Sequence, residues 1–282
     1  MFELKVKNNN NELLNLTNNK NYSVYKIEGL QPPAVTINTS KKSTLDGSTV
    51  NNASVEKRNI VIYMTINGNV ETNRINLYKY FPLKQTVKVY FKNNTRDVYI
   101  EGLVEVIECD LFSNKQIAQI SLICPQPYFE AVDKLVTYFS EVSNLFKFPF
   151  SISKSGMELS VITTDIRRSI VNVGDVETGI IIKINANGTV VNPVIHDVRK
   201  RTHIALNCTL EANDEVIINT NVGEKSITLI RSGVSSNILG YRTPDSKWLT
   251  VAQGDNVFTF SSDTGNSNLQ IQFTTSALYG GV

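Results

Sequence analysis

The sequence predicts a mainly β protein of two domains, and three observations predict it. Apolar and polar residues alternate along much of the chain with the two-residue period of half-buried strands. Turn signals containing Gly, Asn or Asp recur between these segments, as in all-β sandwiches. The chain has 282 residues, more than one modest core usually contains. We therefore expect an N-terminal β-sandwich-like domain with one short helix, then a C-terminal β-sandwich of the jelly-roll or lectin-like type.

The composition is that of an ordinary globular protein, with 41% apolar and 9% aromatic residues. Lys and Arg number 28 against 26 Asp and Glu, a net charge of +2 without a sustained basic run. This argues against a surface that neutralises nucleic-acid phosphates. Cys109, Cys124 and Cys208 are too widely spaced to suggest a disulfide framework or paired zinc ligands. Buried thiols in a reducing compartment are expected.

The sequence suggests neither an export signal nor a membrane span. Residues 1–11, MFELKVKNNNN, lack the apolar core of a signal peptide. The longest aliphatic runs, such as residues 180–182, are far too short to cross a bilayer. We expect a protein that is made in the cytoplasm and does not insert into membranes.

The first 57 residues are polar and irregular. An Asn-rich stretch at 8–21 precedes YSVYKIEGLQPPAVTI, in which Pro32 and Pro33 interrupt an extended pattern, so an edge strand or a crossover is expected there. Residues 41–57 are polar and include Gly, Ser and Asn, so they predict a mobile hairpin or loop. Exposed loops of this kind often carry subunit contacts.

Residues 58–124 predict a mostly antiparallel sheet with one packed helix. A strand begins at Arg58 and stops at Asn67-Gly68, and apolar residues at helical spacing then precede Pro82, which cannot continue a helix. Further strands are expected near residues 87–91, 98–107 and 117–124. The helical residues are Leu77, Tyr78 and Phe81.

We place the domain junction in residues 130–150. Apolar residues recur there at roughly helical spacing, but β-branched and aromatic residues and the FKFPF segment, Phe146–Phe150, favour an extended connector. The helix stays an open alternative. The predicted division is an N-terminal domain at 1–129, a connector at 130–150 and a C-terminal domain at 151–282.

The second half reads as strand after strand. Ile180, Ile182 and Ile184 alternate with other residues before Asn187-Gly188, a dipeptide typical of tight hairpins with positive φ angles. Similar alternation occurs at 204–210 and 269–273. Further turn signals fall at Asn213-Asp214, Gly223-Glu224, Gly254-Asp255-Asn256 and Thr264-Gly265-Asn266.

Candidate catalytic or metal-binding residues are few. His196, Asp197 and His203 form the best metal candidate, but adjacent strand residues point to opposite faces and no third strong ligand is implied. Two carboxylate pairs with acid/base potential, Asp214 with Glu215 and Asp175 with Glu177, sit in turn-like sequence, where solvation of the turn is the commoner role. We predict no catalytic, cofactor-binding or metal-binding residue, and no enzyme.

One aromatic pair suggests sugar binding. The only tryptophan, Trp248, lies near Tyr241, and exposed aromatic rings on a β-sandwich can stack on sugar faces. A single Trp at the start of a strand is more often a core or interface anchor. Sugar stacking at Trp248 and Tyr241 is therefore the less favoured interpretation.

The chain resembles the phage distal tail protein family over essentially its whole length. The first half contributes GLQPP at 29–33, the strand RNIVIYMTINGN, a helix with Arg74, Leu77 and Phe81, CPQPYF at 124–129, and FPF. The second half contributes GDVETGIIIKINANGTVVNPVIHD, LEANDEVIINTNVGEKSITLIR, WLTVAQGDNVFTF and LYGGV, in that order. Each fragment alone is weak, but the series is strong.

The resemblance implies a structural protein of the virion tail tip. The N-terminal domain would form a homohexameric ring around the tail channel, and a galectin-like or carbohydrate-module-like sandwich would face outward. The ring would join the tail tube protein to the tail-associated hub or lysin protein as a baseplate platform that supports receptor-binding proteins and host attachment. No reaction and no cofactor is implied. Longer members carry inserted sugar-binding modules, and this chain resembles the short form.

Residues 31–57 are expected to contribute to the subunit interface of such a ring, because they supply Pro-marked, polar, extended chain. The near-neutral charge also suits a channel wall that must not grip passing DNA. A carbohydrate-binding adhesion module acting through the C-terminal sandwich is the alternative function. A tail-associated hydrolase ranks last.

Overall fold

The computed structural model describes residues 2–41, 43, 46–113, 115–144, 160–164 and 167–282, which form two compact units. The first unit contains Met1–Asp133 and Leu278–Val282, and the second contains Lys134–Ala277. This division differs from the predicted one chiefly because the last five residues return to the first unit. Phe146–Phe150, part of the predicted connector, lie outside the described residues.

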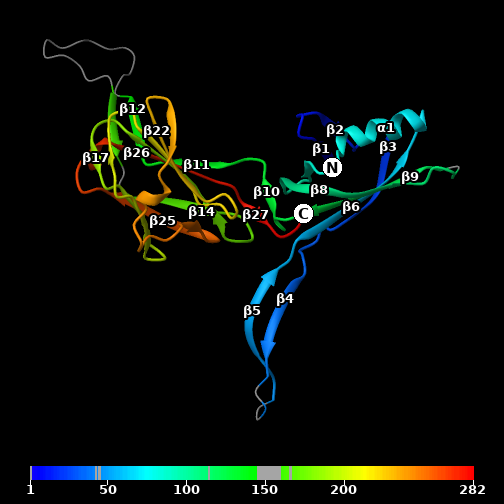
Figure 1. Ribbon diagram of the computed structural model, residues 1–282, viewed down its shortest axis with the longest axis horizontal. Coiled ribbons are helices and arrows are strands. Elements are labelled where there is room, and N and C mark those ends of the chain that lie inside the picture. Colours follow the sequence, from blue (N-terminus) through cyan, green and yellow to red (C-terminus); the bar gives the residue numbers. More distant parts are fainter. Residues whose placement is uncertain (1, 42, 44–45, 114, 145–159, 165–166) are drawn as a thin grey trace. The chain divides into compact units, whose positions relative to one another are not determined.

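The first unit is an antiparallel sheet with a helix and a long hairpin (Figure 1). The main path of the sheet is β2-β1-β7-β8-β9-β6-β3, while β10 pairs with β8, and β27 with β10. The elements are β1 (Glu3–Lys7), β2 (Leu13–Asn15), β3 (Tyr22–Glu28), β6 (Arg58–Ile66), α1 (Val70–Tyr80), β7 (Thr86–Lys92), β8 (Asp97–Cys109), β9 (Ile117–Cys124), β10 (Phe129–Ala131) and β27 (Leu278–Tyr279).

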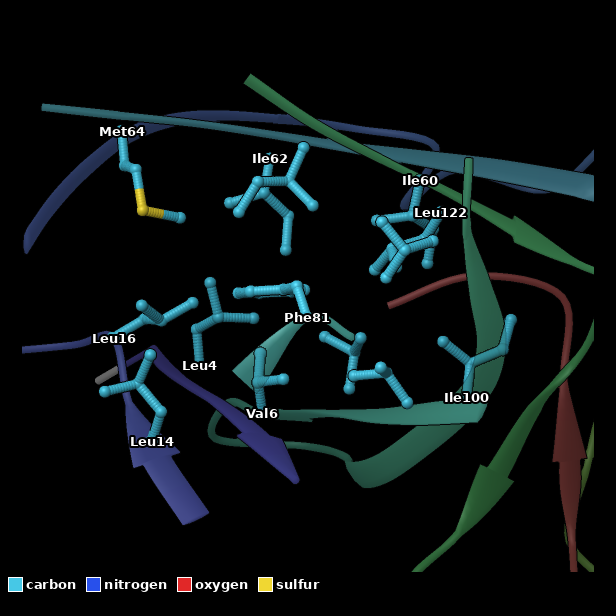
Figure 2. Close-up of a cluster of buried hydrophobic side chains, with 14 of the residues drawn as sticks. Leu4, Val6, Leu14, Leu16, Ile60, Ile62, Met64, Phe81, Ile100 and Leu122 are labelled. Atoms are coloured by element: carbon cyan, nitrogen blue, oxygen red, sulfur yellow. The ribbon is translucent and has the colours of Figure 1, made fainter. Parts of the chain in front are cut away.

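The sheet folds around its own core, which confirms the predicted sandwich-like arrangement. Alternate residues of each strand are buried, as the two-residue period of a half-buried strand requires. Figure 2 shows side chains from β1, from β2 and from Leu16, which follows β2, on one side of the core and side chains from β6 and β9 on the other, with Phe81 between them. The first group is Leu4, Val6, Leu14 and Leu16, and the second is Ile60, Ile62, Met64 and Leu122.

The predicted helix is confirmed as α1. Its N-cap is Asn69, whose side-chain oxygen accepts a hydrogen bond from the backbone N–H of Thr72 at 3.4 Å. Leu77 and Phe81 are buried against the sheet. Pro82 follows immediately and prevents a further turn.

One feature of the first unit was not predicted from the Asn-rich N-terminus. β1 and β2 form a hairpin there, and the alternating apolar residues of FELKVK, of which Leu4 and Val6 are buried, were the signal for β1. β3 lies at the edge of the sheet, as predicted. Where a hairpin or loop was predicted at 41–57, a hairpin is present, but it begins earlier than predicted: its strands are β4 (Val35–Ser40) and β5 (Thr49–Val55).

The second unit is the predicted β-sandwich. A six-stranded sheet, β11-β26-β16-β21-β22-β23, and a four-stranded sheet, β14-β25-β18-β19, contribute to one buried apolar core. Their strands are β11 (Leu135–Tyr138), β14 (Arg167–Asn172), β16 (Ile181–Ala186), β18 (Val194–Asp197), β19 (Thr202–Ala205), β21 (Glu215–Asn219), β22 (Ser226–Arg231), β23 (Val234–Asn237), β25 (Gly254–Ser261) and β26 (Leu269–Thr275).

Shorter elements complete the second unit. Three strand pairs are β12 with β13, β15 with β24 and β17 with β20, and two short 3₁₀ helices are present as well. Their bounds are β12 (Ser140–Asn144), β13 (Ser160–Thr164), β15 (Thr178–Gly179), β17 (Val190–Val191), β20 (Thr209–Leu210), η1 (Leu239–Tyr241), β24 (Thr250–Val251) and η2 (Asn266–Asn268).

The prediction of a hairpin at Asn187-Gly188 was wrong. β16 pairs with β21 and β26 rather than with β17, and neither Asn187 nor Gly188 has a positive φ. Gly188 instead allows the Asn268 side chain to come close to the backbone, because a Cβ at this position would lie 2.7 Å from the side-chain nitrogen of Asn268. The apolar alternation before the turn was interpreted correctly, since Ile180, Ile182 and Ile184 are buried.

Three further expectations met a mixed outcome. The described part of the connector is extended rather than helical, because β11 adds to β26 at the edge of the six-stranded sheet. The alternating stretch at 204–210 is not one strand but parts of β19 and β20. Cys124 is buried as predicted, whereas Cys109 and Cys208 are only half-buried, and all three are free thiols.

Candidate assembly site: the arm and its root

The most exposed regular element of the first unit is the hairpin of β4 and β5, which we call the arm. Neither strand pairs with any other described strand, and Figure 1 shows the arm leaving the sheet of the first unit as a separate two-stranded ribbon. Every residue of β4, and every residue of β5 except Val55, is exposed. An isolated hairpin is marginally stable in water. The arm therefore has the character of a binding element.

The two faces of the arm differ in polarity. Residues directly opposite in an antiparallel pair share a face. One face carries the pairs Val35–Val55, Ile37–Ala53 and Thr39–Val50, and the other carries Thr36–Ser54, Asn38–Asn52 and Ser40–Thr49. Val35, Ile37 and Val50 are 50–60% exposed. The arm is thus an amphipathic ribbon whose apolar face meets water in the single chain.

The root of the arm is organised around Arg58, the first residue of β6. The Arg58 side chain is buried, with 3% of its surface exposed. Its guanidinium donates hydrogen bonds of 2.5–2.8 Å to four backbone carbonyl oxygens and stacks on the ring of Phe129 at 4.5 Å. The acceptors are Gly29, Gln31, Pro127 and Gly280. One side chain therefore joins the segments GLQPP, CPQPYF and LYGGV, which are far apart in sequence.

The electrostatics of this root are unusual for a buried cation. The hydrogen bonds described for Arg58 all go to carbonyl dipoles and none to a carboxylate. Burial lowers the pKa of the guanidinium, although arginine stays charged at physiological pH. The carbonyl oxygens and the face of the Phe129 ring supply the compensating negative potential.

The C-terminal segment Leu278–Val282, which we call the strap, closes the root. β27 pairs with β10, and the N–H of Val282 donates to the carbonyl oxygen of Leu30 at 3.1 Å. A second arginine, Arg96, donates to the carbonyl oxygen of Gly281 and lies 4.3 Å from the centre of the Tyr279 ring. The strap thus holds the chain directly before the arm.

The predicted sugar-stacking residues are not brought together. Tyr241 ends η1 and is exposed, whereas Trp248 is half-buried and packs against the core of the second unit. No contact between the Trp248 ring and the Tyr241 ring is found among the described residues. The cationic groups of Lys225 and Arg242 lie 5.7 and 5.4 Å from the Trp248 ring centre, so the ring has cation–π partners within its own unit. Sugar binding at these residues stays a prediction.

The carboxylate pairs are tied into structural contacts. Asp214 is buried rather than solvated, because it accepts hydrogen bonds from Arg231 Nε at 2.9 Å and from the Glu211 N–H at 2.8 Å. The bond from Arg231 holds the pKa of Asp214 below its usual value. Glu177 accepts from Lys200 at 2.8 Å, and this bond likewise lowers its pKa.

His196 and His203 lie directly opposite each other on β18 and β19, with ring centres 5.9 Å apart. The Nε2 atom of His196 is 3.0 Å from the Ser261 hydroxyl, and that of His203 is 3.1 Å from an Asp245 carboxylate oxygen. The described residues contain no group of three or more His, Cys, Asp or Glu side chains placed to hold a metal ion. His196 and His203 are therefore neighbours across two paired strands, but among the described residues they are not part of a group that could hold a metal ion.

The His196 environment predicts a pH dependence of the second unit. Burial, and then the charge of His203, lower the pKa of His196 in the folded state. When the pH falls below the ordinary pKa of an imidazole, His196 takes up a proton in the unfolded chain but not yet in the folded chain. The free energy of unfolding therefore decreases as the pH falls, until the pH is below the lowered pKa of His196 in the folded state. We expect urea unfolding followed by Trp248 fluorescence to show lower stability at pH 5.5 than at pH 7.5, and His196→Gln to reduce the difference. An equal pH dependence in both proteins would contradict this.

The comparisons with known proteins agree with one another. Residues 173–276 match the family model described as the C-terminal domain of the siphovirus-type tail component. No curated protein sequence matches the chain. Among the described residues, no helix is both long enough and apolar enough to cross a membrane.

Solved structures extend the similarity to nearly the whole chain. The crystal structure of SPP1 Dit (gp 19.1), described as a paradigm of the hub adsorption apparatus in phages that infect Gram-positive bacteria, has a TM-score of 0.68 at 10% identity, covering 97% of this chain and 98% of that one. A chain of the activated phage p2 baseplate with Ca has a TM-score of 0.55 at 12% identity, and the match covers 98% of this chain and 98% of that one. A chain of the same baseplate with Sr has a TM-score of 0.51 at 12% identity, and the match covers 98% of this chain and 99% of that one.

The family match falls inside the second unit, and the fold match includes both units. The predicted resemblance to phage distal tail proteins is thereby confirmed: residues 173–276 match the C-terminal domain model of the siphovirus-type tail component, and the fold over 97% of the chain is similar to that of SPP1 Dit.

Proposed function

We propose that this protein is the distal tail protein of a tailed phage or phage-tail-like particle. Six copies form a ring at the tail tip that joins the tail tube to the tail-associated hub or lysin protein and supports the receptor-binding apparatus. The observation that carries the proposal is the amphipathic arm, an uncovered binding element on a chain whose fold is that of a phage hub protein. The role is structural, and no reaction is assigned to any residue.

A ring is one of the assemblies that the arm can build. If the arm of each copy meets a different surface of the next copy without a reciprocal contact, the contact between copies is heterologous. A heterologous contact repeated around an axis closes into a ring when the rotation fits, and otherwise builds a filament. A platform between a tube and a hub requires the closed form. Burial of Val35, Ile37 and Val50 would supply hydrophobic driving force at each interface.

The mass of the protein in solution tests this function. Light scattering coupled to size exclusion is expected to give a species six times the 31.5 kDa of one chain, and electron microscopy is expected to show it as a ring. If the purified chain is monomeric, adding the tube or hub partner should drive ring formation. A chain that stays monomeric under both conditions contradicts the proposal.

Deletion of residues 41–54 provides the matched variant. We expect it to abolish the ring, because it removes all of β5 except Val55 and leaves β4 without the strand it pairs with. Trp248 lies in the second unit, outside the deletion, so its fluorescence should keep the native unfolding transition. An unchanged oligomer mass after this deletion would show that the arm is not part of the subunit interface.

A further inference from the structure

The turn between β8 and β9 exposes the largest fraction of any large apolar side chain among the described residues. Phe112 lies in this turn and is 99% exposed. Its neighbour Leu111 is 47% exposed, and Ile117, the first residue of β9, is 37% exposed. Figure 1 shows the β8–β9 hairpin projecting from the sheet of the first unit. Apolar side chains gathered at one exposed point, unlike those scattered singly over a surface, mark an interaction site.

Hydrogen bonds within the turn hold the backbone that presents Phe112. The N–H of Asp110 donates to the carbonyl oxygen of Ile117 at 3.1 Å, which closes the turn beyond the end of β8. The Ser113 hydroxyl donates to the carbonyl oxygen of Lys115 at 2.5 Å. A turn that is already ordered loses little conformational entropy when a partner binds it. Phe112 is therefore presented in a form ready for binding.

The outer face of the hairpin beside this turn is acidic. Glu108 lies opposite Gln119, and the same register places Asp110 opposite Ile117. Residues opposite one another, or two apart along a strand, share a face, so both carboxylates lie on the face that carries Ile117. Glu108 and Asp110 are exposed, and no cation of the described chain forms an ion pair with either. Against these two charges the turn has one cation, Lys115.

We call Glu108, Asp110, Leu111, Phe112 and Ile117 the tip, and its chemistry defines the partner that it fits. An anionic lipid surface attracts basic residues and would repel the two carboxylates. A protein pocket lined by apolar side chains can bury the Phe112 ring, and an aromatic anchor in a pocket is a common centre of binding energy. Lys or Arg side chains around such a pocket would meet the carboxylates and orient the contact.

A second copy of this chain is a poor match for the tip. The first unit has an apolar hollow beside β3, lined by residues that include Leu16 and Tyr22. Lys26 is the one cation among the residues that line this hollow, and it already forms an ion pair with Glu28. The hollow therefore lacks free basic side chains around its rim, so the partner of the tip is a different protein.

We propose that the tip docks the ring onto the protein stacked against it, which supplies an apolar pocket for Phe112 bordered by Lys or Arg side chains. This inference rests on the proposed function and names the surface through which the ring meets the tube or the hub. All copies of a cyclic ring present the tip at the same height. The tips can therefore engage a partner of matching symmetry together, so that a contact that is weak in one copy becomes strong in the ring.

Binding of the full-length protein to the purified tube protein and to the purified hub protein tests the role of Phe112. We expect Phe112→Ser to weaken binding to one of these partners by about tenfold or more. The matched control is Val222→Ser in the second unit, because Val222 is 73% exposed and its loss should leave binding unchanged. Light scattering should give the same oligomer mass for both variants and the wild type, since neither side chain is buried.

The salt dependence of the same binding tests the charges. Binding of the wild type should weaken when salt is raised from about 0.1 M to about 0.5 M, because salt screens exposed charge pairs. The double variant Glu108→Gln/Asp110→Asn should bind more weakly than the wild type at the lower salt concentration, and its binding should change less with salt. If this variant keeps the salt dependence of the wild type, the rim of the pocket is not basic and the stated chemistry of the partner is wrong.

The outcomes separate this inference from the function on which it rests. Weaker binding of Phe112→Ser, with the double variant less sensitive to salt, supports the proposal. Equal binding by Phe112→Ser and Val222→Ser overturns it and leaves the ring standing. A smaller oligomer of Phe112→Ser would show that the tip joins copies of this chain, and binding to phosphatidylglycerol vesicles that Phe112→Ser abolishes would show a lipid ligand; either result also overturns it. A wild type that binds neither tube nor hub overturns the proposed function as well.

Discussion

Replacing Arg58 by alanine is expected to destabilise the first unit by roughly 3–5 kcal/mol, while the second unit keeps its stability. The substitution removes the donor for four buried carbonyl oxygens and leaves a cavity beside Phe129. A buried acceptor without a partner costs its full desolvation. Hydrogen exchange of β6 and β10 should report the loss. The fluorescence of Trp248, the only tryptophan, follows the second unit separately.

Two matched variants separate the geometry of Arg58 from its charge. Arg58→Lys keeps the charge but lacks the planar fork of donors that reaches several carbonyls at once, so an intermediate loss is expected. Arg74→Ala removes a half-buried arginine whose described hydrogen bond goes to the Tyr78 hydroxyl, and should change stability by no more than about 0.5 kcal/mol. Equal losses for Arg58→Ala and Arg74→Ala would refute the role given to the root.

Gly29→Ala is the second substitution with a large expected effect. Gly29 has a φ of +84°, and a Cβ there would lie 2.0 Å from the carbonyl oxygen of Asn59 on β6. Because that atom is backbone, the overlap can be relieved only by moving the root of the arm against β6. Left-handed backbone alone costs an alanine about 1–2 kcal/mol. We expect a clearly larger loss, together with loss of ring formation, measured by denaturant unfolding and light scattering.

Gly47→Ala is the matched control within the first unit. Its φ of +92° is similar, but nothing lies within 4 Å of the position that a Cβ would take. The difference between the two variants therefore isolates the close approach of Gly29 to Asn59. If both variants lose the same stability, the approach contributes nothing and only the backbone conformation matters.

The elements that the sequence predicted well are those that local patterning specifies. β6, β9 and α1 each have a clear period and a definite stop signal, and the structure confirms all three. The Asn187-Gly188 hairpin failed for the opposite reason. A local turn signal was overridden by tertiary contact with Asn268, which uses the small size of the glycine rather than its conformational freedom.

The candidate site was only partly predictable. The polar stretch at 41–57 indicated a hairpin, and alternation at Val35, Ile37 and Val50 could have indicated its amphipathic face. The root could not be found in this way, because Arg58 binds backbone carbonyls, which every residue has. One of these belongs to Gly280, 222 residues away in sequence. Contacts of that separation leave no local pattern.

The strap also has a consequence for biosynthesis. Residues 278–282 belong to the first unit, yet they are translated after the entire second unit. Until residues 278–282 have been translated, the Arg58 guanidinium lacks its Gly280 acceptor and Leu30 lacks the N–H of Val282. The first unit can therefore reach its final form only once the second has been made. A product that terminates before residue 278 lacks both of these contacts at the root.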